Sequence, residues 1–91
     1  MNENFNVGDI VLSVAGHDAD MFYVVVSTEG VYAYICNGKL HKIEKPKKKK
    51  FKHLKNTGCT YKELTGVQLE KSKVTNPALK KAIALFKNRD L

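Results

Sequence analysis

The chain has 91 residues, 43% of them hydrophobic, and its formal net charge is +7. A chain of this length forms one domain, or one small domain with an appendage, and leaves little room for a deep catalytic pocket. Its hydrophobic content argues against disorder throughout, and no apolar run approaches the ~20 residues that cross a bilayer.

The first half of the chain has the alternation that is typical of β-strands. Residues 7–14 place Ile10, Leu12 and Val14 on one face, which we expect to be the buried face of a half-buried strand. Turn-forming residues separate this segment from two others that are rich in β-branched and aromatic side chains. The pattern therefore predicts three short strands, at residues 7–14, 21–28 and 31–36.

Two more strands are predicted after the Asn37-Gly38 pair. Both residues tolerate a positive φ, so the pair favours a tight type I′ turn, from which Lys39–Ile43 returns as a fourth strand. Pro46 interrupts this strand because proline has no amide hydrogen to donate, and Lys49–Leu54 is expected to form the fifth. Five short strands with no helix among them predict a small antiparallel barrel, which we place at residues 1–56.

The last third of the chain, residues 57–91, is predicted to be a helical extension. Thr60-x-x-Glu63 has the spacing of a capping box, which predicts a short helix beginning at Tyr61. Asn76-Pro77 is expected to start a second helix, with the asparagine as its N-cap. An apolar stripe follows at 3.6-residue spacing and consists of Leu79, Ala82, Ile83 and Phe86. We expect this stripe to pack on the barrel, and the alternative is a docking face for a partner protein.

Positive charge is concentrated in the middle of the chain. Residues 1–38 contain no Lys or Arg and five acids, whereas residues 39–55, the lysine-rich segment, contain nine lysines and one acid. Such a block favours a polyanionic partner, and lysine in place of arginine favours phosphate contacts over base reading. A solvated face and a localisation signal around Pro46–Lys50 are the alternatives. The candidate phosphate-binding residues are Lys39, His41, Lys42, Lys45, Lys47, Lys48, Lys49, Lys50, Lys52 and Lys55.

Three residues outside this segment are further candidates for RNA contact. Tyr32 and Tyr34 share one face of their strand and would stack on unpaired bases if they are exposed; alternatively, they cover the barrel. His17 lies in a polar loop, where it either contacts phosphate or is only solvated. Gly16, in the same loop, is expected to supply a corner with a positive φ.

No motif in the sequence indicates a metal site or a catalytic site. Cys36, His41, His53 and Cys59 have metal-ligand side chains, but their spacing matches no common zinc pattern, so both cysteines are expected to be free thiols. The chain contains no phosphate-binding glycine loop and no nucleophile elbow. We expect a protein that is not an enzyme and has no metal, cofactor or small-molecule substrate. The acidic, polar first residues do not resemble a signal peptide, and we expect a cytoplasmic location.

Two stretches of the chain resemble KOW-domain proteins. Residues 7–11 (VGDIV), Gly16 in a polar loop and the apolar run 22–26 (FYVVV) are similar to a KOW motif, which forms two strands and a loop in SH3-like barrels. Residues 36–50 (CNGKLHKIEKPKKKK) are similar to the basic segment of small bacterial KOW-domain RNA-binding proteins, which are themselves similar to large-subunit ribosomal proteins of eukaryotes and archaea. The family loop commonly reads Gly-Arg-Asp-Lys-Gly, whereas this chain has Gly-His-Asp-Ala-Asp at residues 16–20. This departure shifts the expected phosphate contacts onto the lysine-rich segment.

The resemblance implies a mainly β fold, a five-stranded SH3-like (KOW) antiparallel barrel with a C-terminal helical tail. Together with the charge pattern it implies a ribosome-associated protein that binds the phosphate backbone of structured RNA, with ribosomal RNA as the expected partner. Ribosomal or transcription proteins are expected as further partners, and a membrane is not. The alternative is a protein-interaction module that docks on a transcription or translation partner through Tyr32, Tyr34 and the helical stripe.

Overall fold

A single antiparallel sheet dominates the computed structural model, which describes residues 4–89. Its strands are hydrogen-bonded in the order β4-β3-β2-β1-β5, so the last strand returns to pair with the first. The two edge strands, β4 and β5, are connected through the short 3-10 helix η1, and no ladder joins them within the described chain. The elements are β1 (Asp9–Ser13), β2 (Phe22–Glu29), β3 (Tyr32–Cys36), β4 (Lys47–Lys50), η1 (Phe51–His53) and β5 (Leu54–Thr60).

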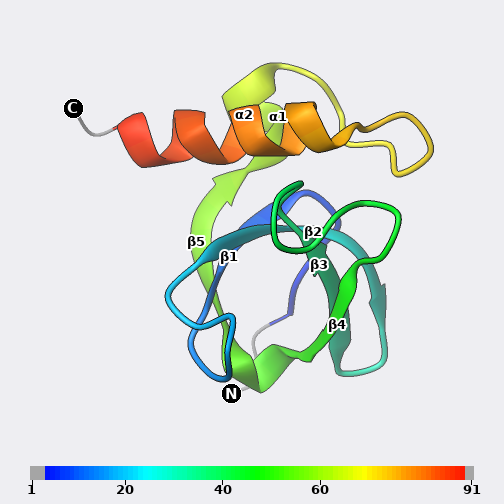
Figure 1. Cartoon of the computed structure of the whole chain (residues 1–91), viewed down its shortest axis with the longest axis vertical. Helices are drawn as coiled ribbons and strands as arrows, with labels where there is room; N and C mark the ends of the chain where they lie inside the picture. Colours follow the sequence, from blue (N-terminus) through cyan, green and yellow to red (C-terminus); the bar gives the residue numbers. More distant parts are fainter. Residues whose placement is uncertain (1–3, 90–91) are drawn as a thin grey trace.

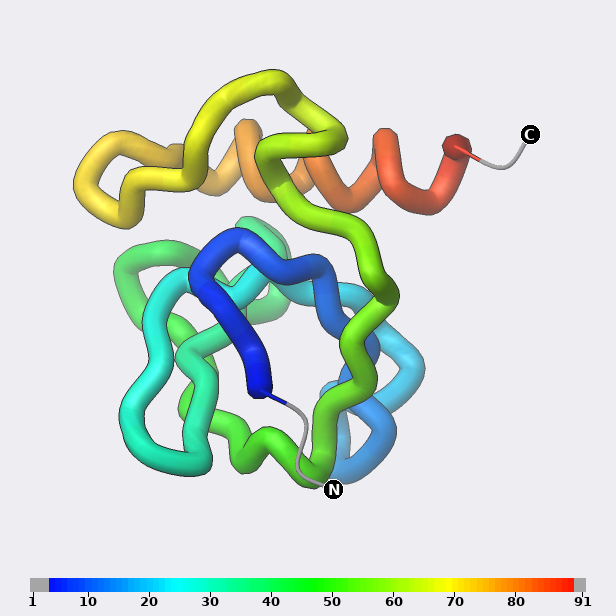
Figure 2. The backbone as a smooth tube through the Cα atoms, turned by 180° about the vertical axis from the view of Figure 1, so that it is seen from behind, coloured from blue at the N-terminus to red at the C-terminus, as the bar shows by residue number. Residues whose placement is uncertain are grey.

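Two α-helices, α1 (Tyr61–Thr65) and α2 (Asn76–Asn88), follow the sheet. The sheet curls into a ring, and both helices lie across the same end of it (Figures 1 and 2). The prediction of a mainly β fold with five antiparallel strands and a C-terminal helix is therefore confirmed. Within residues 4–89, no helix has the length and apolar character needed to cross a membrane.

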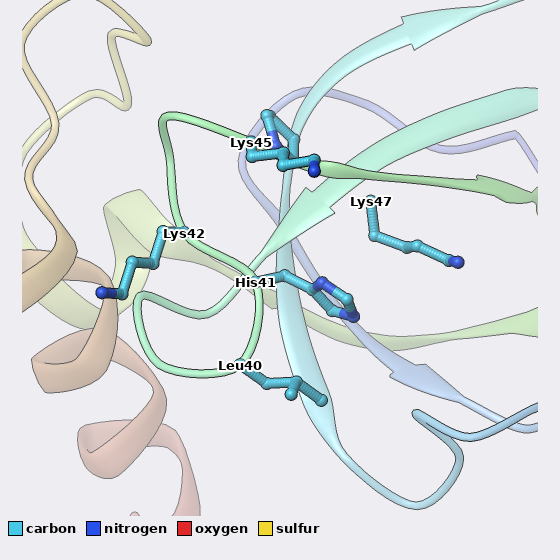
Figure 3. Close-up of a pocket in the computed structure, with 6 residues that line it drawn as sticks. Leu40, His41, Lys42, Lys45 and Lys47 are labelled. Atoms are coloured by element: carbon cyan, nitrogen blue, oxygen red, sulfur yellow. The ribbon is translucent and has the colours of Figure 1, made fainter.

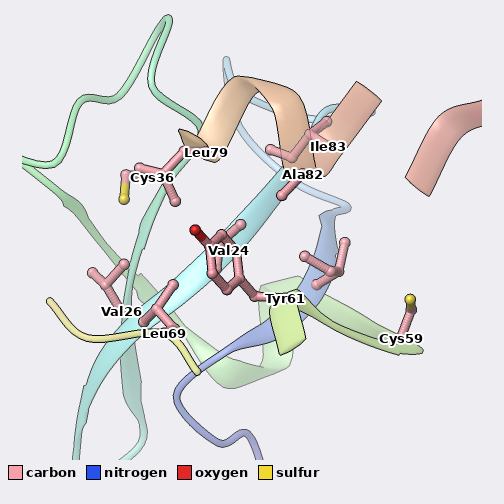
Figure 4. Close-up of a cluster of buried hydrophobic side chains, with 10 residues drawn as sticks. Val24, Val26, Cys36, Cys59, Tyr61, Leu69, Leu79, Ala82 and Ile83 are labelled. Carbon is pink, nitrogen blue, oxygen red and sulfur yellow. The ribbon is translucent and has the colours of Figure 1, made fainter. Parts of the chain in front are cut away.

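Hydrophobic side chains on the two faces of the sheet form two cores. The outer core lies between the sheet and the helices, and Figure 4 shows Leu79, Ala82 and Ile83 of α2 in it together with Val24 of β2. The inner core fills the ring and includes Val25 of β2. Because β2 is buried on both faces, its sequence is a continuous apolar run instead of an alternating one.

The first strand is also buried on both faces, which corrects the prediction of a half-buried strand. Ile10 belongs to the outer core, but Val11, which was expected to face away from the core, is fully buried in the inner core. Val14, expected inside, lies beyond the end of β1 and is 49% exposed. Alternation indicated a strand here, but it could not reveal that the helices cover the face of Ile10 while the face of Val11 lines the inside of the ring.

Residues 37–46, between β3 and β4, form a loop and not the predicted fourth strand, Lys39–Ile43. Asn37 closes the loop on itself, because its Oδ1 accepts hydrogen bonds from two amides farther along the loop at 3.0 and 3.1 Å. At the far end, the amide of Ile43 donates to Oδ1 of Asn76, the first residue of α2, at 2.8 Å. These contacts occupy amides that a strand would use in a ladder, and one of them comes from a residue distant in sequence.

The lysine run itself forms β4, and the predicted fifth strand, Lys49–Leu54, is divided among three elements. Residues 49 and 50 end β4, residues 51–53 form η1, and β5 begins at Leu54. β5 then continues to Thr60, beyond the expected end of the barrel at residue 56. The sequence patterns therefore located the first three strands but misplaced the two that follow Cys36.

The two helices begin where capping residues occur. Thr60 caps α1 by accepting from the amide of Glu63 at 3.1 Å, which confirms the predicted start of this helix at Tyr61. α2 is capped by Thr75, whose hydroxyl accepts from the amide of Ala78 at 3.2 Å, and not by Asn76 as predicted. The side chain of Asn76 is therefore available to bind the loop of residues 37–46.

Candidate nucleic-acid interface

The lysine-rich segment contains eight exposed lysines and one buried lysine. The register of β4 against β3 explains the difference, because Lys48 and Lys50 pair with Tyr34 and Tyr32, whereas Lys49 pairs with Ala33 of the inner core. Successive side chains of a strand point to opposite faces, so Lys49 points into the ring. We call the eight exposed lysines the basic strip: Lys39, Lys42, Lys45, Lys47, Lys48, Lys50, Lys52 and Lys55.

Lys49 does not belong to the exposed surface, which corrects its interpretation as a phosphate-binding residue. Its Nζ donates to Oδ1 of Asp18 at 2.5 Å and to the carbonyl oxygen of Ala15 at 2.6 Å. Both charged side chains are more than 90% buried. Gly16, with φ of +85°, permits this approach, since a Cβ there would lie 3.0 Å from the Lys49 Nζ. The expected positive φ at Gly16 is confirmed.

The Asp18 carboxylate has two oxygens in different situations. Oδ1 accepts from Lys49 and from the Ser13 hydroxyl, whereas Oδ2 is buried without a hydrogen-bond partner. Burial alone would raise the pKa of Asp18, but the charge of Lys49 and the hydrogen bonds to the carboxylate together outweigh burial and lower the pKa below its usual value. Asp18 is therefore an anion whose second oxygen has unused acceptor capacity.

A basic pocket of about 450 Å³ opens in the loop of residues 37–46 and the start of β4. Figure 3 shows that the side chains of Leu40, His41, Lys45 and Lys47 extend to the same side, whereas Lys42 points the other way. The pocket thus combines cationic groups with small apolar patches. Its lining residues are Leu40, His41, Lys42, Lys45, Pro46 and Lys47.

His41 connects the basic pocket to the buried acid. Its Nε2 lies 3.8 Å from Oδ2 of Asp18, and its ring centroid lies 5.7 Å from that of Tyr23. Tyr23 is fully buried, and burial together with the charge of Asp18 raises its pKa to about 12, so its hydroxyl is neutral at physiological pH. The ring of His41 is accordingly held between a carboxylate and a pocket lined by lysines.

Both tyrosines proposed for base stacking lie half-buried on the outer face of β3, where they contact Lys48 and Glu29. Lys48 Nζ lies 4.5 Å from the centroid of the Tyr32 ring and 3.6 Å from a Glu29 carboxylate oxygen. The Tyr34 hydroxyl donates to Glu29 at 2.9 Å, and this hydrogen bond raises the pKa of Tyr34. Tyr34 also packs against the outer core, so Tyr32 is the better placed of the two for stacking.

The basic strip runs from one end of the ring to the other. The loop of residues 37–46 contacts α2 at the helical end, β4 follows, and η1 lies at the end away from the helices (Figure 1). Lys52 is in η1 and Lys55 is on β5, opposite Leu12 of β1. The remaining candidate, His17, is exposed in the β1–β2 loop.

Neither cysteine has the surroundings of a reactive or metal-binding thiol. Cys36 and Cys59 are free and buried in the outer core, and burial raises the pKa of the Cys36 thiol to about 12. Among the side chains of residues 4–89, no group of three or more His, Cys, Asp or Glu is arranged to hold a metal ion.

Two acidic residues that the charge pattern did not select as site residues, Asp18 and Glu29, contact the candidate surface. Neither contact could be predicted from local patterns, because each acid meets its lysine through the pairing of distant segments. In the sequence, Asp18 was notable only as one of the loop residues that match the KOW pattern. In comparisons with known proteins, no family model matches the chain and no curated protein matches it either.

Proposed function

We propose that this protein binds RNA by contacting successive phosphates of the backbone along the basic strip. The supporting observation is that eight lysines lie exposed along consecutive parts of the chain, which are the loop of residues 37–46, β4, η1 and the start of β5. Of these eight, only Lys48 has a carboxylate within ion-pair distance among the described residues. Phosphates that replace the counterions of such a strip release them, which drives binding without sequence preference.

We propose different roles for the residues of this interface. Lys45 and Lys47 contact phosphate at the basic pocket, with His41 beside them. Lys48 and Lys50 continue the strip along the outer face of β4, where Tyr32 offers a ring to an unpaired base. Lys49 contributes indirectly, because its ion pair with Asp18 fixes the β1–β2 loop against β4.

The proposal that the partner is RNA, and that the fold is an SH3-like barrel, rests on the resemblance to KOW-domain proteins. A sheet whose fifth strand returns to pair with the first is compatible with an SH3-like barrel, and we propose that identity for it. Gly16 and Asp18, which match the family loop, lie against Lys49 of the segment that carries the second part of the resemblance. On this basis, the partner is structured RNA of the ribosome.

The alternative, a protein-interaction module, lacks one of the surfaces that it requires. Leu79, Ala82 and Ile83 of the helical stripe are buried in the outer core. Phe86 packs edge-on against Phe22, with 5.0 Å between ring centroids. The stripe is therefore occupied within the chain, whereas the basic strip is open.

Binding of a fluorescein-labelled RNA hairpin and of a second hairpin of equal length and unrelated sequence tests the proposal by anisotropy. We expect both RNAs to bind the native protein with similar affinity and both to bind Lys45→Gln/Lys47→Gln more weakly. Lys80→Gln/Lys81→Gln, which removes the same charge from the exposed face of α2, is the matched control and should bind nearly as well as the native protein. Equal losses in the two double variants, or no binding by the native protein, would contradict the proposed interface. A pull-down whose protein partners persist after RNase treatment would favour the alternative.

A further inference from the structure

The basic pocket and the buried Asp18 carboxylate share one neighbour, the ring of His41. The imidazole lines the pocket on one side, and on the other its Nε2 is 3.8 Å from the Asp18 oxygen that has no hydrogen-bond partner. The side chain of Asp18 is only 6% exposed, so water has little access to that oxygen. A buried acceptor without a partner is costly, and Nε2 of His41, when it carries a proton, is a donor within ion-pair distance of this oxygen.

The protonation state of His41 decides what the pocket offers to an anion. A neutral imidazole has one N–H, and if Nε2 carries it toward Asp18, then Nδ1 presents a lone pair that repels an anion. An imidazolium has an N–H on both nitrogens, so it can donate to Asp18 and to a bound anion together.

We propose that the basic pocket is a seat for one phosphate group, which His41 binds as an imidazolium between that phosphate and Asp18, so that binding takes up a proton. The inference rests on the proposed function in taking the phosphate to be one of the RNA backbone. A phosphodiester carries its charge throughout the physiological range, so the proton goes to His41 and not to the ligand.

The charges around His41 explain why a bound anion shifts its protonation. In the free protein the pocket lysines oppose a further positive charge, whereas Asp18 favours it. Lys49 already neutralises much of the Asp18 charge, and the buried Tyr23 hydroxyl is neutral. An anion in the pocket offsets the repulsion from the lysines, so the bound anion favours the protonated form of the His41 ring. The ionisable groups that surround His41 are Asp18, Tyr23, Lys42, Lys45, Lys47 and Lys49.

Sulfate, whose charge is constant near neutral pH, is the probe for the phosphate seat. Titration followed by NMR at constant ionic strength should shift resonances of His41, Lys45 and Lys47, and sulfate should bind roughly three- to tenfold more tightly at about pH 6 than at about pH 7.5. His41→Gln should bring this ratio close to one. His17→Gln and His53→Gln remove the other two histidines and should leave the ratio unchanged. The inference would be overturned if the ratio persisted in His41→Gln, or if sulfate shifted only the resonances of residues outside the pocket.

The same titration with hexauridine that lacks terminal phosphates separates the inference from the proposed function. If hexauridine binds with the same dependence on pH and His41, both are supported. Binding of hexauridine without any pocket shifts overturns the phosphate seat and leaves RNA binding in place. Binding of sulfate in the pocket with the His41-dependent ratio, but no binding of hexauridine or of an RNA hairpin, supports the seat and contradicts RNA as its ligand.

Discussion

At the scale of single residues, Lys48 and Lys49 are neighbours in sequence with opposite roles. Lys48 is about half exposed, and its carboxylate partner, Glu29, lies 3.6 Å away in solvent. Lys49 is buried with Asp18, so its charge depends on that one partner. Exposed ion pairs contribute little to stability, whereas loss of one member of a buried pair leaves an uncompensated charge in a site of low polarity.

Substitution of each lysine by methionine should separate these two roles. Lys49→Met leaves Asp18 buried without its cation and is expected to lower the free energy of unfolding by about 3–5 kcal/mol. Lys48→Met breaks only the exposed pair and should cost less than about 1 kcal/mol. Urea unfolding followed by circular dichroism measures both values. Similar losses in the two variants would show that the ion pair of Lys49 is not buried as described.

The same pair predicts how stability depends on acid. The pKa of Asp18 is lowered in the folded protein, so its contribution is fully present above the unfolded value of about 3.9 and is lost as the pH falls through the folded value. Unfolding free energies measured from about pH 6 to about pH 2 should therefore fall below about pH 4, and Asp18→Asn should make this fall shallower. If the free energy of unfolding of Asp18→Asn fell as steeply below about pH 4 as that of the native protein, other carboxylates would be responsible for the effect.

At the scale of elements, the loop of residues 37–46 is positioned by α2. Asn76 accepts from the amide of Ile43 at 2.8 Å, and its Nδ2 donates to both carboxylate oxygens of Glu44 at 2.8 and 2.9 Å. The hydrogen bond from Asn76 lowers the pKa of Glu44. The backbone of Gly38 approaches closely as well, because a Cβ there would lie 2.3 Å from the carbonyl oxygen of Asn76. The C-terminal helix thereby fixes the loop that carries the basic pocket.

Two glycines with nearly the same φ allow this contact to be measured. Gly38 and Gly66 have φ of +78° and +76°, but a Cβ at Gly66 would meet nothing within 4 Å. Gly66→Ala should therefore cost only the strain of the left-handed conformation, about 1–2 kcal/mol. Gly38→Ala should cost more, because it also pushes the loop away from α2, and the amide of Ile43 should then exchange faster with solvent. Unfolding free energies and hydrogen exchange provide the comparison, and equal costs with unchanged exchange would contradict the loop–helix contact.

The elements that could be predicted from the sequence are those whose signals are local. β1, β2 and β3 follow from apolar patterns, and α1 follows from the capping box of Thr60 and Glu63. The position of β4 could not be predicted, because it depends on Asp18 meeting Lys49 and on Asn76 meeting the loop, and both contacts join distant segments. The lysines of the candidate site could also be predicted, because a run of lysines is a local signal. The burial of Lys49 and the position of Asp18 beside His41 could not be predicted.

At the scale of the whole molecule, acidic and basic residues are concentrated in different parts of the fold. The first 38 residues carry five acids and no Lys or Arg, and they supply β1, β2 and β3, the middle of the sheet. The lysines lie on the loop of residues 37–46 and on β4, an edge strand of the sheet, and no strand of residues 4–89 pairs with its outer edge. Lysine side chains on an edge strand also discourage pairing with other sheets, so one feature serves both stability in solution and the proposed binding of RNA.

This arrangement predicts how RNA binding depends on salt. With roughly four to six phosphates contacted, the logarithm of the association constant should fall against the logarithm of salt concentration with a slope of about −3 to −5. Lys45→Gln/Lys47→Gln removes two of the contacts, so its slope should be shallower by roughly one to two. Lys80→Gln/Lys81→Gln changes the net charge equally but should keep the native slope, because its lysines lie on α2, outside the basic strip. Anisotropy titrations of labelled oligouridine over a range of potassium chloride concentrations give these slopes. If both double variants reduced the slope equally, net charge and not the strip would govern binding, and a slope near zero for the native protein would contradict phosphate contacts altogether.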